Sequence, residues 1–182
     1  MKKLVIVFIF LTLFSQFAFS DDISVSSFIG VYIGYGHMVN HISNYNGVLY
    51  MDQKFNILLL GISTRYGISN KISDDLTLYF LGLLDLGFDI NFSPEIITLA
   101  VPAILGGEVK VKYKDYFFGL GNGIGYYAPA SNSIWFFLRP SFGYVIKPNL
   151  LIDVFVDLIN IGISSTRENG YFRLGFTFSI FK

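Results

Sequence analysis

The sequence predicts an all-β protein, an eight-stranded antiparallel up-and-down transmembrane β-barrel, preceded by a cleaved secretory signal peptide. Three observations lead to this expectation. The 182-residue chain is 53% hydrophobic and only 14% charged, whereas charged residues make up about 25% of an average soluble domain. After the first twenty residues, no segment reaches the roughly 18 uninterrupted apolar residues that a transmembrane helix requires. Hydrophobicity instead repeats at every second residue, which is the period of a β-strand.

The first twenty residues have the organisation of an export signal. Lys2 and Lys3 precede an apolar stretch at residues 4–14, and small residues follow up to Ser20. This order of basic, apolar and small residues is typical of a signal peptide. The apolar stretch is short for an uncleaved anchor helix, which needs about 20 apolar residues. We therefore expect residues 1–20 to be a cleaved signal peptide and residues 21–182 to form an outer-membrane β-barrel.

Alternating apolar and small or polar residues delimit the eight strands. We expect them at residues 28–39, 54–67, 75–90, 96–112, 116–128, 134–146, 150–162 and 170–181. A soluble, half-buried sheet also alternates, but its solvent face would carry more lysine and glutamate than the polar faces here. A wall that faces lipid explains such an apolar exterior better.

The first four strands each separate a large apolar face from a small or polar one. The expected outward residues are Ile29, Val31, Ile33 and Tyr35; Leu58, Leu60, Ile62 and Tyr66; Leu78, Phe80, Leu84, Leu86 and Phe88; and Leu99, Val101, Ala103, Leu105 and Val109. The expected inward residues are Gly30, Tyr32, Gly34 and Gly36; Gly61, Ser63 and Arg65; Thr77, Asp85 and Asp89; and Thr98, Glu108 and Lys110.

The fifth strand shows the alternation most clearly. Glycines at 119, 121, 123 and 125 alternate with Phe118, Leu120, Asn122, Ile124 and Tyr126. Four glycines in seven residues would strongly destabilise a helix. In a narrow barrel the glycines leave room inside, while the large side chains face lipid.

The last three strands repeat the pattern. Their expected outward residues are Phe136, Leu138, Phe142 and Tyr144; Leu150, Ile152, Val154, Val156 and Leu158; and Phe172, Leu174, Phe176, Phe178 and Ile180. Their expected inward residues are Arg139, Ser141 and Gly143; Asp153 and Asp157; and Arg173, Gly175, Thr177 and Ser179.

The connections indicate an orientation. The turns at 112–115 and 147–149 are short, and the 67–74 connection lies on the same side. With an even number of strands both termini share that side, which we assign to the periplasm; the polar connections 40–48, 91–95, 129–133 and 164–169 are then extracellular. Aromatic belts are expected at the two ends. They comprise Tyr66, Tyr113, Tyr116 and Tyr144 at the periplasmic end, and Tyr35, Tyr126, Trp135 and Tyr171 at the other, although Trp135 and Tyr171 carry inward parity.

Inward charges form the candidate site. If the sixth and seventh strands pair around Pro148, Arg139 lies opposite Asp157, and Asp157 also faces Arg173 if the last two strands pair around residue 165. Asp85 and Asp89 are expected to join this cluster from across the lumen. The structural interpretation is that buried charges must be paired; the alternative is a gated ion path or an anion site. Residues 58–60 and 81–84 are apolar on both faces, which favours a packed lumen or an apolar ligand over a water-filled channel.

The residues 116–127 and 171–181 give the chain a resemblance to the small eight-stranded outer-membrane barrels, the group of the OmpA transmembrane domain and OmpX. This resemblance implies a Gram-negative outer-membrane location, contact with outer-membrane lipid, insertion by the outer-membrane assembly machinery and a monomeric state. Members serve as anchors, adhesion or defence proteins, narrow pores or lipid-modifying enzymes. The chain departs from the group at its end, because Lys182 follows the outward series and Phe181 is out of phase with it.

The sequence favours a non-enzymatic barrel with a structural or surface-interaction role. His41-Ile42-Ser43 resembles the His-x-Ser pair of an outer-membrane lipid A deacylase family, with Asp52 as the nearest carboxylate, but such tripeptides occur by chance. No cysteine, G-x-S-x-G, P-loop or carboxylate-rich metal motif is found, and no basic patch suits nucleic acid. We expect no catalytic, cofactor or metal site, and the sequence does not identify a surface partner. A small pore, an apolar-ligand barrel and a lipid A-modifying hydrolase are the alternatives.

Overall fold

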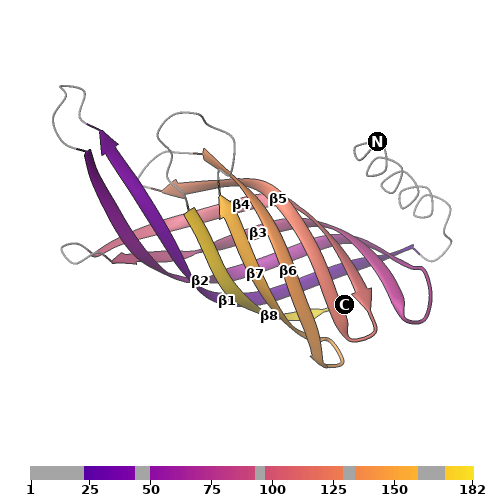
Figure 1. The fold of residues 1–182 in the computed structure, drawn as a ribbon. Helices are drawn as coiled ribbons and strands as arrows, with labels where there is room; N and C mark the ends of the chain where they lie inside the picture. Colours follow the sequence, from indigo (N-terminus) through magenta and orange to yellow (C-terminus); the bar gives the residue numbers. More distant parts are fainter. Residues whose placement is uncertain (1–22, 44–49, 93–96, 129–133, 160–170) are drawn as a thin grey trace, which may run out of the picture.

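The computed structural model describes residues 23–43, 50–92, 97–128, 134–159 and 171–182. The expected signal peptide at 1–20 lies outside these residues. The described chain forms eight strands (Figure 1): β1 Ile23–Ser43, β2 Tyr50–Lys71, β3 Leu76–Phe92, β4 Ile97–Tyr113, β5 Tyr116–Ala128, β6 Ile134–Lys147, β7 Leu150–Ile159 and β8 Tyr171–Phe181. Within the described ranges, no helix is long and apolar enough to cross a membrane.

Each strand pairs antiparallel with its neighbour in the chain, and β8 pairs with β1 to close the barrel. The predicted eight-stranded up-and-down barrel is therefore confirmed. Following cross-strand partners once around the wall from Ile23 returns to Ile33. This ten-residue offset is the shear of the barrel, and it goes with strands tilted by roughly 35–45° to the barrel axis.

The expected strand bounds are correct to within a few residues except at β1 and β2. These strands were expected at 28–39 and 54–67, but they are longer at both ends. Beyond Met38 in β1 and before Asn56 in β2, the two strands pair with each other and with no other described strand. The hairpin therefore projects past the barrel rim, as Figure 1 shows for the indigo and purple strands.

The expected connection at residues 67–74 is wrong as well, because β2 is longer than expected at this end too. The β2 strand continues to Lys71 because the start of β1 supplies partners, with Ile23 opposite Asn70. The turn between β2 and β3 is confined to residues 72–75. It lies beside the β4–β5 turn, since the Lys114 amide donates to the carbonyl of Asp75 at 2.8 Å.

The outer wall of the barrel is apolar along most of its described length. Large exposed side chains include Val31, Ile62, Leu86, Leu105, Leu120, Phe136, Phe176 and Ile180. The inward side chains that the structure describes are buried or half-buried, and the predicted alternation holds with one exception: Leu78, expected to face outward on β3, is only 3% exposed. A soluble protein would not stably expose so continuous an apolar wall, whereas a transmembrane barrel requires one.

The aromatic belts are only partly as expected. Tyr113, Tyr116 and Tyr144 are exposed beside the short turns. Tyr66 is exposed too, but it lies five residues before the end of the extended β2 strand and so not at the turn. The assignment of Trp135 to the outer belt is wrong, because this side chain is 3% exposed and packs inside the barrel, as its inward parity requires.

Candidate functional site

The centre of the first interior cluster is Arg139 on β6. Its Nε donates to Oδ1 of Asp157 at 2.5 Å, and its Nη2 donates to Oδ2 of the same carboxylate at 2.8 Å. Its Nη1 donates to Oδ2 of Asp85 across the lumen at 2.5 Å. These three residues are at most 1% exposed. Two-point pairing of a guanidinium with a carboxylate is the strongest geometry available to such a pair.

Arg173 on β8 extends the cluster. It is the cross-strand partner of Asp157, with Nη1 3.8 Å from the Asp157 Oδ2. Its Nη2 donates to Oδ1 of Asp89 at 3.3 Å. The structure thus brings all five candidate residues into one chain of contacts, Asp85–Arg139–Asp157–Arg173–Asp89. We call these five residues the outer ionic cluster.

Aromatic rings support both guanidinium groups of the outer ionic cluster. The Cζ of Arg139 lies 4.4 Å from the ring centroid of Phe155 and 5.3 Å from that of Phe137. The Cζ of Arg173 lies 6.0 Å from the ring centroid of Tyr32. Cations at these distances are attracted to the ring face, most strongly where water is excluded. The rings therefore offset part of the cost of burying two cations.

A second group, the inner ionic cluster, was not predicted as a unit. Arg65 Nε lies 2.6 Å from Glu108 Oε2, and Arg65 Nη1 lies 3.5 Å from Asp153 Oδ2. Lys110 Nζ donates to the same Asp153 oxygen at 2.7 Å. All four charged side chains are fully buried, and the Ser141 hydroxyl donates to Glu108 at 3.0 Å.

The sequence signal for the inner ionic cluster was the inward parity of its members. Arg65, Glu108 and Asp153 belong to β2, β4 and β7, which are not neighbours in the wall. No hairpin register could pair them, because they meet across the lumen. Their grouping follows from the shear of the closed barrel, which depends on all eight registers together.

Apolar clusters fill the rest of the described lumen. Toward the short turns, a set comprises Phe28, Tyr79, Leu81, Phe117 and Leu151, with Val145 and Phe181 packed against it. A second set comprises Tyr32, Ile57, Leu59, Leu83, Ile104, Trp135, Phe137, Phe155 and Ile159. Inward glycines seat several of these rings; a Cβ at Gly125, for example, would collide with Cζ2 of Trp135. The interior described by the structure is therefore a packed core of rings and paired charges.

The His-x-Ser pair lies at the projecting hairpin. The backbone register places His41 opposite Asp52, but the side chains of His41, Ser43 and Asp52 fall outside the described ones. Among the described side chains, no group of three His, Cys, Asp or Glu residues is arranged to hold a metal ion.

No protein-family model and no curated protein matches the sequence. Among solved structures, the chain is similar to a barrel from the de novo design of transmembrane β-barrels, with 18% identity and a TM-score of 0.44 over 85% of this chain and 95% of that one. It is similar to the outer membrane protease OmpT of Escherichia coli, with 9% identity and a TM-score of 0.35 over 90% and 96%. It is also similar to Ail, the attachment invasion locus protein of Yersinia pestis, with 10% identity and a TM-score of 0.26 over 86% and 99%. At these values the similarities concern barrel architecture alone.

Proposed function

We propose that this protein is a non-enzymatic outer-membrane barrel whose lumen is closed and whose projecting β1–β2 hairpin serves a structural or surface-interaction role. The proposal includes export through the signal peptide at residues 1–20, insertion by the outer-membrane assembly machinery, and the kinship with the OmpA transmembrane domain and OmpX. Outer-membrane lipid is the expected surrounding of its wall.

The observation that carries the proposal is the combination of an apolar outer wall with a packed interior. The nine charged side chains of the two ionic clusters are at most 2% exposed. Each of them lies within 4 Å of an opposite charge in the same interior. A water-filled pore would leave such side chains hydrated, so the packing supports a structural role for the clusters over an ion path.

The direction of the hairpin is the second part of the proposal. Both ends of the described chain lie at the same barrel end as the short turns, where the Ser27 and Lys182 backbones exchange hydrogen bonds at 2.9–3.0 Å. The hairpin projects from the opposite rim. If the short turns face the periplasm, as in other barrels of this kind, the hairpin extends into the extracellular medium, and its two outer edges have no strand partner among the described residues.

Single-channel recording tests the closed lumen. Purified protein in planar bilayers is expected to show no steady conductance, and the heat-modifiable shift in electrophoretic mobility confirms that the recorded protein is folded. Reproducible channels from the folded wild-type protein would refute the closed-lumen proposal and favour the small-pore alternative.

Epitope tagging tests location and orientation. One tag is inserted into the connection 44–49, and a matched tag into the β4–β5 turn at Asp115. On intact cells an antibody should label only the first tag, and after permeabilisation both. Recovery of the protein in the inner membrane or the soluble fraction, or labelling of the Asp115 tag on intact cells, would contradict the proposal.

A further inference from the structure

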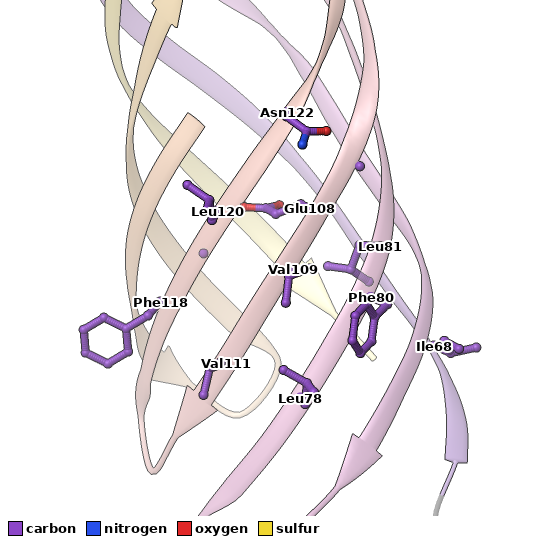
Figure 2. A pocket seen from close by; sticks show the side chains of 12 residues that line it. Ile68, Leu78, Phe80, Leu81, Glu108, Val109, Val111, Phe118, Leu120 and Asn122 are labelled. Atoms are coloured by element: carbon purple, nitrogen blue, oxygen red, sulfur yellow. The ribbon is translucent and has the colours of Figure 1, made fainter. Parts of the chain in front are cut away.

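A groove interrupts the outer wall over β3, β4 and β5 (Figure 2). It has a volume of about 860 Å³. Its outward-facing lining is apolar except at one end and comprises Ile68, Leu78, Phe80, Val109, Val111, Phe118, Leu120 and Asn122. The lipid-facing wall is therefore hollowed here, with Asn122 at the upper end of the hollow in Figure 2.

Two neighbouring glycines lie at the hollow, and one of them, Gly107, is part of its lining. Gly82 on β3 and Gly107 on β4 are cross-strand partners with outward parity. A Cβ built on Gly82 would meet nothing nearer than the Tyr66 carbonyl oxygen at 3.5 Å, and one on Gly107 nothing nearer than the Leu81 carbonyl oxygen at 3.8 Å. Several inward glycines seat rings, as Gly125 does for Trp135 and Gly175 for Phe155, but Gly82 and Gly107 face open space. We call Gly82 and Gly107 the glycine notch.

Asn122 borders the notch, because it is the cross-strand partner of Gly107. It lies six residues from the start of β5, which corresponds to about 14 Å above the turn at the expected rise and tilt. That height is near the middle of an apolar band about 25 Å tall. An amide side chain there faces hydrocarbon that offers no hydrogen-bond partner.

The other polar side chain in the middle of the wall has a partner within the barrel. The Thr64 hydroxyl donates to the Leu84 carbonyl at 3.1 Å. Within the described chain no hydrogen bond involves the Asn122 side chain. Small residues beside a hydrogen-bonding side chain are the combination that lets membrane-embedded segments approach closely and associate.

We propose that the glycine notch and Asn122 form the contact with a second copy of this chain in the membrane. In a two-fold dimer with its axis at Asn122, the residue meets its own symmetry mate. A carboxamide has both donor and acceptor, so two identical amides satisfy each other through paired hydrogen bonds. The notch lets the walls approach closely enough for this pair. The inference rests on the proposed membrane location and departs from the monomer that the family resemblance implies.

Disulfide trapping tests the contact, because the chain contains no cysteine. A disulfide needs Cα atoms about 4.4–6.8 Å apart, which a residue on the axis provides. Asn122→Cys gives up the amide pair but keeps the notch, and mild oxidation in phosphatidylcholine vesicles makes each transient contact between two copies permanent, so a covalent dimer should still accumulate. Val31→Cys is the matched control: Val31 is 58% exposed on the outer face of β1, which lies across the barrel from β5. The dimer yield should be at least tenfold lower in the control.

A second variant tests whether the trapped dimer depends on the glycine notch or forms by random collision of barrels in the vesicle. The Cβ of Gly107→Leu lies in open space, 3.8 Å from the nearest atom, and the rest of the side chain enters the groove. In the Asn122→Cys background this substitution should lower the trapped fraction at least tenfold, whereas Val31→Leu should not. Equal trapping of Asn122→Cys and Val31→Cys, or indifference to Gly107→Leu, would overturn the proposal.

The chain without cysteine provides an independent measurement. Single-molecule photobleaching in the same vesicles should show two-step traces for the wild type and at least a tenfold weaker dimer for Asn122→Leu. One-step photobleaching of the wild type would show a monomer and overturn the proposed dimer. A monomer that retains a bound lipid in native mass spectrometry would overturn it as well. Heat-modifiability of the same samples reports insertion, so a barrel that does not insert refutes the proposed function and a monomeric inserted barrel refutes only the dimer.

Discussion

Replacement of Asp157 by alanine should destabilise the barrel more than any single exposed substitution. The Asp157 carboxylate accepts two hydrogen bonds from Arg139 and lies 3.8 Å from Arg173. Its removal leaves Arg139 with Asp85 and Arg173 with Asp89 as their remaining carboxylate contacts in the outer ionic cluster. Removing one member of a buried ion pair costs about 3–5 kcal/mol, because the partner charge stays buried. Two charge-assisted hydrogen bonds at about 1.5–3 kcal/mol each give a similar figure.

Unfolding in urea with the protein in lipid vesicles measures this loss. Trp135 is the one tryptophan of the chain, and it packs against Phe137 beside the cluster, so its fluorescence reports the interior. A loss of about 3–5 kcal/mol lowers the folding equilibrium constant by roughly two to nearly four orders of magnitude. Asp157→Asn, which keeps the shape but not the charge, should fall between wild type and alanine.

The matched control is Asp74→Ala, which removes a carboxylate that is 98% exposed in its ion pair with Lys71. This exposed pair should contribute nothing measurable, since solvent screens it. If Asp157→Ala changed the free energy of unfolding by less than about 1 kcal/mol, the outer ionic cluster would not be a structural element. That result would favour the alternative interpretation of the cluster as part of an ion path.

Two further predictions use other parts of the barrel. Gly125→Ala should destabilise the protein by about 1–3 kcal/mol, as overpacking does, and should change Trp135 emission, because the added Cβ meets the indole. Gly107→Ala adds the same atom in open space, so it should change neither the stability nor the emission. Equal losses of stability for the two variants in unfolding titrations would contradict the packing of Trp135 against Gly125. The hydrogen bond from Lys71, together with its charge, holds the pKa of Asp74 below its usual value. Any effect of this exposed pair on stability is too small for unfolding titrations to detect; by linkage it is present above the unfolded-state pKa of about 3.9 and is lost as pH falls through the folded pKa. NMR titration should instead show an upward shift of the Asp74 midpoint in Lys71→Ala, and an unchanged midpoint would contradict the pairing.

Much of this architecture could be predicted because local rules determine it. Strand phase follows from the side chains alone, so Arg139, Asp157 and Arg173 could be assigned to the lumen. Hairpin register follows from the turn: the expected pairing around Pro148 matches the observed register of β6 and β7 from Phe137 to Val145. Phase and register together were enough to anticipate which charges meet within adjacent strands.

The strand lengths and the contacts across the lumen could not be predicted in this way. The Gly67–Lys71 segment contains residues that favour turns, and it becomes part of β2 because the start of β1 pairs with it. Arg65 meets Glu108 and Asp153 only when the shear of the closed barrel has been set by every register. Such contacts are properties of the closed sheet and have no signature within one hairpin.

The same closure explains why charges and glycines occur together inside. An eight-stranded barrel has an interior just wide enough for side chains to fill, so a bulky residue on one strand needs a small one beside it, as Trp135 has in Gly125. Charged side chains at the other inward positions must contact opposite charges, because an unpaired charge in this buried interior would be costly. Outward glycines have no ring to seat, so interior packing does not explain the notch at Gly82 and Gly107. The dimer that we propose would give the notch a role, because small residues let two walls approach closely.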